Sequence, residues 1–99
     1  MQTHKNELLV PPVAASTSDA VEFIRAWKVG DGMHISLNHT AWRQPAAWGI
    51  ALADIVQHFA DACEKSQGWP RKDIIKQVVT MFNAELNSPT DKPTGDFTK

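Results

Sequence analysis

The sequence contains a single cysteine, Cys63, among its 99 residues. One cysteine cannot form an internal disulfide, and it cannot supply a Cys₄ or Cys₂His₂ zinc site. This usage is typical of proteins in the reducing cytosol, where disulfides are rare. We therefore expect a cytoplasmic protein that has neither a structural disulfide nor a structural zinc ion.

Long hydrophobic runs and a strong charge of either sign are also missing. No apolar run approaches the roughly 20 residues that cross a bilayer, and the first residues lack the apolar stretch of a signal peptide. Ten lysines and arginines are scattered among eleven acids, which gives a net charge of −1. Phosphate binding requires a clustered basic surface. We expect one domain at this length, and neither a membrane protein nor a nucleic-acid-binding protein.

A tight turn between two apolar segments is the clearest feature that is present. Glycine, aspartate and glycine occupy positions 30–32, and glycine supplies the positive φ angles that a sharp reversal requires. The flanking segments, 21–29 and 33–37, alternate as strands do. A helix over 18–27 is the competing interpretation, but the period of two and the adjoining turn favour an antiparallel β-hairpin.

The loop length of this hairpin decides which side chains share a face. A two-residue loop at 31–32 would divide the apolar residues between opposite faces, whereas a three-residue loop that pairs Trp27 with Ile35 gathers them on one face. We expect the second register, with Gly32 in the left-handed conformation. The shared face would then carry Val21, Phe23, Trp27, Val29, Met33, Ile35 and Leu37.

Two helices are predicted after the hairpin. The first begins near Pro45, where the missing N–H costs nothing, and stops near Gly68, which suits the residue after a helix. The second begins near Pro70 and ends at about residue 87. Each carries an apolar stripe at helical spacing, and the second is wide enough to predict contact on two sides. Either the second helix lies against both the sheet and the first helix, or part of it meets another subunit. The stripes are Trp48, Leu52, Ile55, Val56, Phe59 and Cys63, and then Ile75, Val78, Val79, Phe82 and Leu86, widened by Ile74 and Met81.

The order strand, strand, helix, helix predicts an α+β fold in which two helices cover one face of the hairpin. Residues 21–87 form the single domain, after an extended arm over 1–20 and before a flexible tail over 88–99. Two strands alone are marginally stable, and both edges of the hairpin are open. We therefore expect a homodimer, and a four-stranded sheet across the dimer is one way to complete the sheet.

Candidate interaction residues fall in three places. An apolar island in the arm either packs on its own domain or adds as a strand to a neighbour. Tryptophan and arginine, residue types that anchor interfaces, stand at the entry to the first helix. The widened stripe of the second helix predicts a further contact. These residues are Leu8, Val10, Trp42, Arg43, Ile74 and Met81.

Asp54, His58 and Asp61 share one face of the first helix through their spacing of four and three residues. A carboxylate four residues from an imidazole can orient it or join it on a metal ion. Ion pairing on a solvated surface is the simpler interpretation. The three residues nevertheless define an alternative function, a metal-binding or acid–base enzyme. Because no other catalytic motif is present, a non-enzymatic binding or protein-interaction domain without a cofactor is the favoured interpretation. Its partner would be a protein or a small molecule that the sequence does not identify.

Four stretches carry a wider likeness: Leu8–Pro12; Arg25–Val29 with the turn that follows; Pro45–Gly49 leading into Leu52–Ile55 and His58; and Phe82–Asp91. Together they resemble a family of small bacterial proteins known only as a domain of unknown function. The likeness covers most of the chain outside the tails, and it implies a bacterial, stand-alone domain without an assigned activity. Members of that family often carry an acidic residue where this chain has Gln44, and an acidic side chain would cap the first helix better.

Overall fold

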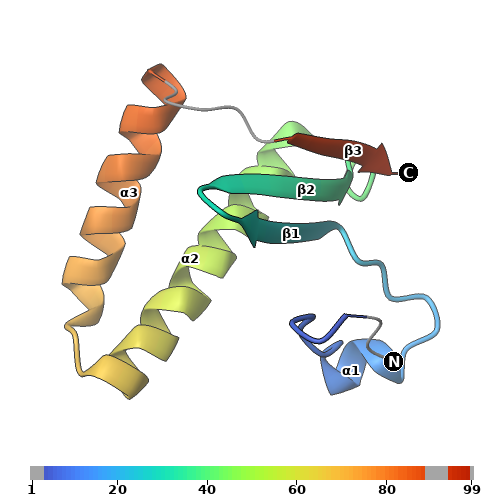
Figure 1. Ribbon diagram of the computed structural model, residues 1–99, viewed down its shortest axis with the longest axis horizontal. Coiled ribbons are helices and arrows are strands. Elements are labelled where there is room, and N and C mark those ends of the chain that lie inside the picture. Colours follow the sequence, from blue (N-terminus) through green and yellow to red (C-terminus); the bar gives the residue numbers. More distant parts are fainter. Residues whose placement is uncertain (1–3, 89–93, 99) are drawn as a thin grey trace.

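The computed structural model describes residues 4–88 and the backbone of residues 94–98. A hairpin followed by two helices confirms the α+β class and the ββαα order (Figure 1). Within these residues, no helix combines the length and the apolar character needed to cross a membrane. The elements are α1 (Pro12–Ala15), β1 (Ile24–Val29), β2 (Gly32–Asn38), α2 (Pro45–Gln67), α3 (Arg71–Asn87) and β3 (Thr94–Thr98).

The hairpin closes through two residues rather than three. Val29 pairs with Gly32, so Gly30 and Asp31 form the loop. Gly30 has a φ of 60° and Asp31 has no positive φ, which is the pattern of a type II′ turn. The twist of such a turn matches the twist of the paired strands. The expected three-residue loop and the left-handed Gly32 are therefore wrong.

The observed register divides the apolar residues between both faces of the hairpin. Trp27 pairs with His34, and Ile35 pairs with Ala26. Directly paired residues point to the same face, and neighbours along a strand point to opposite faces. Trp27 and Ile35 therefore lie on opposite faces. The expected single apolar face is not formed, because both faces of this hairpin carry apolar side chains.

A third strand extends the sheet. β3 runs parallel to β2 and pairs Thr94 with His34 and Thr98 with Asn38, in the strand order β1-β2-β3 (Figure 1). The tail was expected to lack regular structure, but its described part is this strand; residues 89–93 and 99 lie outside the described residues. Because β3 covers the edge of β2, the edge strands of the described sheet are β1 and β3. A sheet continued through β1 in a dimer would have six strands rather than four.

The N-terminal arm is not extended throughout. Pro12–Ala15 forms the single-turn helix α1, which begins at a proline, where the absent N–H is not needed. The Thr17 hydroxyl donates a hydrogen bond of 2.6 Å to the carbonyl oxygen of Val13 and stabilises the end of this turn. Residues 1–3 of the arm lie outside the described part of the chain.

The two long helices begin and end close to the predicted positions. α2 begins at Pro45 and is closed by Gly68, which has a φ of 74° and donates its N–H to the Glu64 carbonyl oxygen. Gln44 occupies the N-cap position and makes no side-chain capping bond. α3 begins at Arg71, directly after Pro70. Local signals at the helix ends thus predicted both helices correctly.

Few side chains are buried. Among the described residues, Ala60 of α2 is 0% exposed and Ile74 of α3 is 6% exposed, and these are the buried hydrophobic residues. Among the described elements, α3 brings its Cα atoms within 8 Å of α2 alone. Figure 1 shows α2 passing behind the sheet, while α3 stands beside α2 and away from the strands. The sheet and α3 therefore do not share a core within one chain.

The turn geometry makes a direct prediction for Gly30. Gly30→Ala should lower the free energy of unfolding by roughly 1–2 kcal/mol, because a Cβ is disfavoured at positive φ. Nothing lies within 4 Å of the added Cβ, so the cost arises from the backbone alone. Gly32→Ala is the matched control: its Cβ would meet the Val29 carbonyl oxygen at 3.6 Å, an ordinary contact. Urea denaturation measures both variants, and a larger loss for Gly32→Ala would contradict the two-residue loop.

Candidate functional site

Three aromatic rings join the sheet layer to α2. Phe23 precedes β1, Trp42 lies in the connector after β2, and Trp48 lies in the first turn of α2. Their ring centroids are 4.8 Å apart for Phe23–Trp42, 5.6 Å for Phe23–Trp48 and 5.5 Å for Trp42–Trp48, with planes 64° to 86° apart. Such edge-to-face contacts are the arrangement that ring quadrupoles prefer. These three residues, the aromatic cluster, fix the N-terminal end of α2 against the start of β1.

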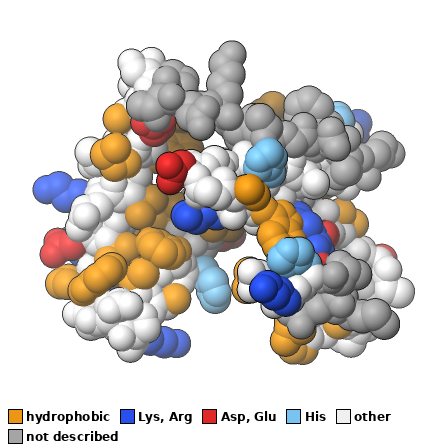
Figure 2. Space-filling model, viewed as in Figure 1, with side chains coloured by type: hydrophobic (Ala, Val, Ile, Leu, Met, Phe, Trp, Pro, Cys, Tyr) orange, Lys and Arg blue, Asp and Glu red, His pale blue; other side chains and the backbone are white. Residues whose placement is uncertain are grey.

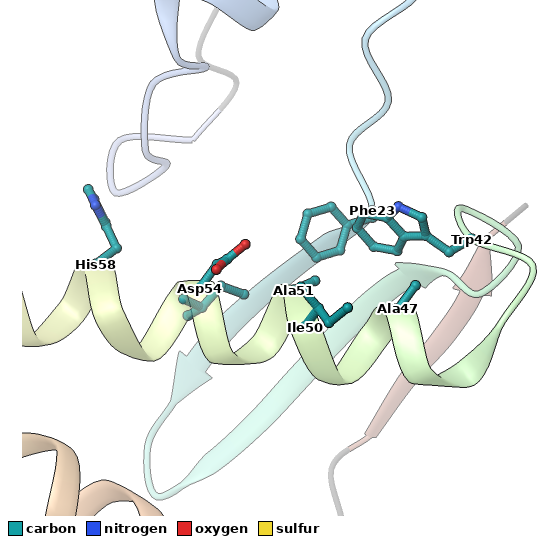
Figure 3. Close-up of a pocket in the computed structure, with 8 residues that line it drawn as sticks. Phe23, Trp42, Ala47, Ile50, Ala51, Asp54 and His58 are labelled. Atoms are coloured by element: carbon teal, nitrogen blue, oxygen red, sulfur yellow. The ribbon is translucent and has the colours of Figure 1, made fainter.

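An apolar groove opens beside the aromatic cluster. Figure 3 shows the rings of Phe23 and Trp42 lying over one face of α2. The cavity has a volume of about 620 Å³, and Ile50 on its wall is 66% exposed. Its lining is apolar except for Asp54 and His58, which lie further along the helix. This α2 groove is lined by Phe23, Trp42, Ala47, Ile50, Ala51, Asp54, Ile55 and His58.

The three residues of the alternative enzyme function are not assembled into one ligand set. Asp54 and His58 line the α2 groove, whereas the Asp61 carboxylate accepts a hydrogen bond of 2.7 Å from Nε of Arg71. The described residues contain no group of three or more His, Cys, Asp or Glu side chains that could hold a metal ion. The helical spacing is as predicted, but Asp61 is engaged by the next helix.

Arg71 forms a polar contact between the start of α3 and α2. Its guanidinium also bonds to Gln57, and its backbone N–H donates to a Glu64 carboxylate oxygen at 3.3 Å. The hydrogen bond from Arg71 lowers the pKa of Asp61 below its ordinary value of 3.8; desolvation opposes this, and the nearby charges of Arg71 and Lys65 assist it. The side chains of Arg71 and Asp61 are 39% and 52% exposed. Because exposed pairs contribute little free energy, this contact mainly positions α3.

The N-terminal arm is fixed to β1 by charge and by a ring contact. Glu7, whose side chain is 10% exposed, forms an ion pair with Arg25. Arg25 also pairs with Glu22 at 3.1 Å. The hydrogen bond to Glu7 and then that to Glu22 raise the pKa of Arg25. The ring of His4 meets that of Trp27 edge-on, with centroids 4.8 Å apart. These contacts hold His4 and Glu7 of the arm against β1.

The six predicted interaction residues lie on three separate parts of the chain, and Ile74 does not belong to the surface. It is 6% exposed, so it serves the packing of α3. The other five are exposed to different degrees. Leu8 is 90%, Val10 48%, Met81 59% and Trp42 37% exposed, and Arg43 is also exposed.

Sequence reasoning missed a further exposed set on α3. Val79 is 44%, Phe82 47% and Leu86 68% exposed. The apolar stripe of the second helix included these residues, and its width predicted contact on two sides, but Ile74 and Met81 were the residues of that helix expected to meet a partner. A stripe at helical spacing shows that a face requires cover; it does not show what covers it.

Comparison with known proteins places the chain in a family. The family model described as a domain of unknown function (DUF5076) matches residues 7–90. The chain belongs to this family. A solved structure described as "a putative pyruvate dehydrogenase from the photosynthetic bacterium Rhodopseudomonas palustrus CGA009" is 31% identical, with a TM-score of 0.75 over 99% of this chain and 100% of that one. Curated proteins give no match. The resemblance to a family of unknown function is thus confirmed, and no activity comes with it.

The Arg71–Asp61 contact predicts a titration behaviour. The pKa of Asp61, measured by carboxyl-detected NMR, should lie below 3.8 and should rise in Arg71→Gln, which removes the charge and the Nε donor. Because the folded-state pKa is depressed, the small stabilisation by this pair is present above the ordinary carboxyl pKa and is lost as the pH falls through the folded value. Lys65→Met is the control, with a smaller rise expected. Equal rises in both variants would contradict the assignment to Arg71.

The aromatic cluster predicts an energetic coupling. Phe23→Leu and Trp48→Leu, made singly and together, should show a coupling of about 0.5–1.5 kcal/mol in the free energy of unfolding, as measured edge-to-face pairs do. Trp69 is 54% exposed and follows the other end of α2. A second cycle of Phe23→Leu with Trp69→Leu should therefore be additive. If the coupling in this second cycle were as large as in the first, the coupling would reflect a general loss of packing rather than the ring contact.

Proposed function

We propose that this chain is a non-enzymatic interaction domain that works as a homodimer. Its exposed surface is the observation that supports this. The chain has an accessible surface of 8599 Å², whereas a folded monomer of 11.0 kDa exposes about 5600 Å². The excess of about 3000 Å² is well above the roughly 800 Å² that each partner buries in a standard interface.

The shape and the side chains agree with this excess. The radius of gyration is 15.2 Å, compared with about 13 Å for a compact chain of this length. Large apolar side chains that are at least 37% exposed occur on α1, β1, β2, α2 and α3. Figure 2 shows orange apolar side chains in patches on the left part of the visible face and near its centre. Small domains often complete such a core by association.

A second candidate function comes from the α2 groove. Two polar side chains, Asp54 and His58, on an otherwise apolar wall form a composition typical of ligand pockets. An acid–base or small-molecule site would use these two residues. The interaction function is favoured because Ile50 and Ile55 in the same groove belong to the excess apolar surface, which a partner would cover.

The homodimer is tested by sedimentation equilibrium at micromolar concentration. We expect a mass about twice the 11.0 kDa of the chain, and an unfolding temperature that rises with protein concentration because association selects the folded state. A monomer whose unfolding does not depend on concentration would exclude the proposal. The alternative has its own test: a stoichiometric metal, or a bound small molecule, that is lost in His58→Ala would favour a site in the α2 groove over the interaction function.

A further inference from the structure

We propose that the apolar stripe of α3 pairs with the same stripe of a second copy of this chain, helix against helix and antiparallel. The inference rests on the homodimer proposed above and names its contact surface. The α3 stripe consists of Ile75, Val79, Phe82 and Leu86.

Three of the four residues of the α3 stripe are exposed within the described part of the chain. α3 meets α2 through Arg71, which bonds to Asp61, and carries the buried Ile74 in the same turn. No described strand brings a Cα atom within 8 Å of an α3 Cα, and Figure 1 shows α3 apart from the sheet. Val79, Phe82 and Leu86 remain 44–68% exposed. The helix is thus packed on one side and leaves a second apolar side open.

The spacing of the stripe is that of a helix–helix seam. Its residues follow one another at intervals of four, three and four, which is the pattern of core positions in paired helices. The pattern 4-3-4 reads the same from either end. A stripe with this spacing can therefore match an inverted copy of itself, as a two-fold interface requires.

The sizes of the side chains favour the antiparallel orientation. In this orientation Val79 lies opposite the partner's Phe82, and Ile75 lies opposite the partner's Leu86. Each layer then joins a β-branched residue to a longer one, so that the layers have similar volumes. A parallel pair would place Phe82 against the partner's Phe82 and Val79 against the partner's Val79, which gives unequal layers.

Charge favours the same orientation. Opposed helix dipoles attract when two helices run antiparallel. Lys72 and Lys76 lie in the first half of α3. An antiparallel pair separates them from the partner's Lys72 and Lys76 along the axis, whereas a parallel pair places each lysine level with its counterpart. The occupant is therefore a second copy of this chain, because the stripe matches an inverted copy of itself in volume and that orientation keeps like charges apart.

The stripe is tested by charge substitution on two sides of the same helix. Phe82→Glu places two carboxylates in the interface of a symmetric dimer, and we expect dimer dissociation to become roughly 100-fold or more easier. Met81→Glu is the matched control: Met81 is 59% exposed but points about 100° away from Phe82 around the helix, so the change should be less than about threefold. Sedimentation equilibrium gives the constants, and circular dichroism confirms that each variant is folded.

The outcomes separate this inference from the homodimer itself. A monomeric wild-type protein overturns both proposals. A wild-type dimer that survives Phe82→Glu overturns only the α3 contact. If Met81→Glu or deletion of residues 1–16 dissociates that dimer instead, the interface lies on the other side of α3 or on the arm.

Spin labels test the orientation even if a charged variant fails to fold. Labels are placed at Asn83→Cys or Lys72→Cys in a Cys63→Ser background, because Cys63 is a free cysteine. With a rise of 1.5 Å per residue, antiparallel pairing separates the two Asn83 positions by about 8 Å along the axis and the two Lys72 positions by about 25 Å. We expect the Asn83 labels to be closer together by about 10 Å or more. Equal distances would indicate a parallel pair and overturn the proposal.

Discussion

The contact among the rings of Phe23, Trp42 and Trp48 determines how the sheet and the helices are joined. Backbone hydrogen bonds hold β1, β2 and β3 to one another, and each helix satisfies its own backbone groups. Neither set crosses from the sheet to the helices. The orientation of α2 therefore depends on side chains, and the aromatic cluster lies at the N-terminal end of that helix. The far half of α2 extends past the strands and carries α3 with it (Figure 1).

The aromatic cluster attaches α2 to the sheet at the N-terminal end of the helix, and this explains why so much apolar surface is exposed. α3 packs on the part of α2 that lies beyond the sheet, so its open side cannot reach the strands. Ala60 of α2 and Ile74 of α3 are buried, while Phe59 of α2 stays 50% exposed and Leu86 of α3 stays 68% exposed. A chain of this size buries a modest fraction of its surface even when compact. The homodimer proposed above would cover part of this exposed apolar surface.

Local chemistry predicted the parts of this fold that depend on local signals. Pro45 and Gly68 mark the ends of α2 through rules about one or two residues, and both positions were correct. The hairpin register was not predictable in this way, because the turn residues permit two loop lengths and both faces carry apolar side chains. β3 was missed for a different reason: the segment Thr94–Thr98 has no apolar alternation, and its strand forms by pairing with β2, which is far away in the sequence.

The contacts of the candidate site, like the hairpin register and β3, could not be predicted from local signals. Spacing alone placed Asp54, His58 and Asp61 on one face, but Arg71, ten residues beyond Asp61, takes that carboxylate for a contact between helices. Together with the buried Ile74, this contact fixes the rotation of α3 about its axis. That rotation leaves the stripe from Ile75 to Leu86 facing outward. Asp61, which resembles a metal ligand in the sequence, thus helps to determine which apolar face of α3 stays exposed.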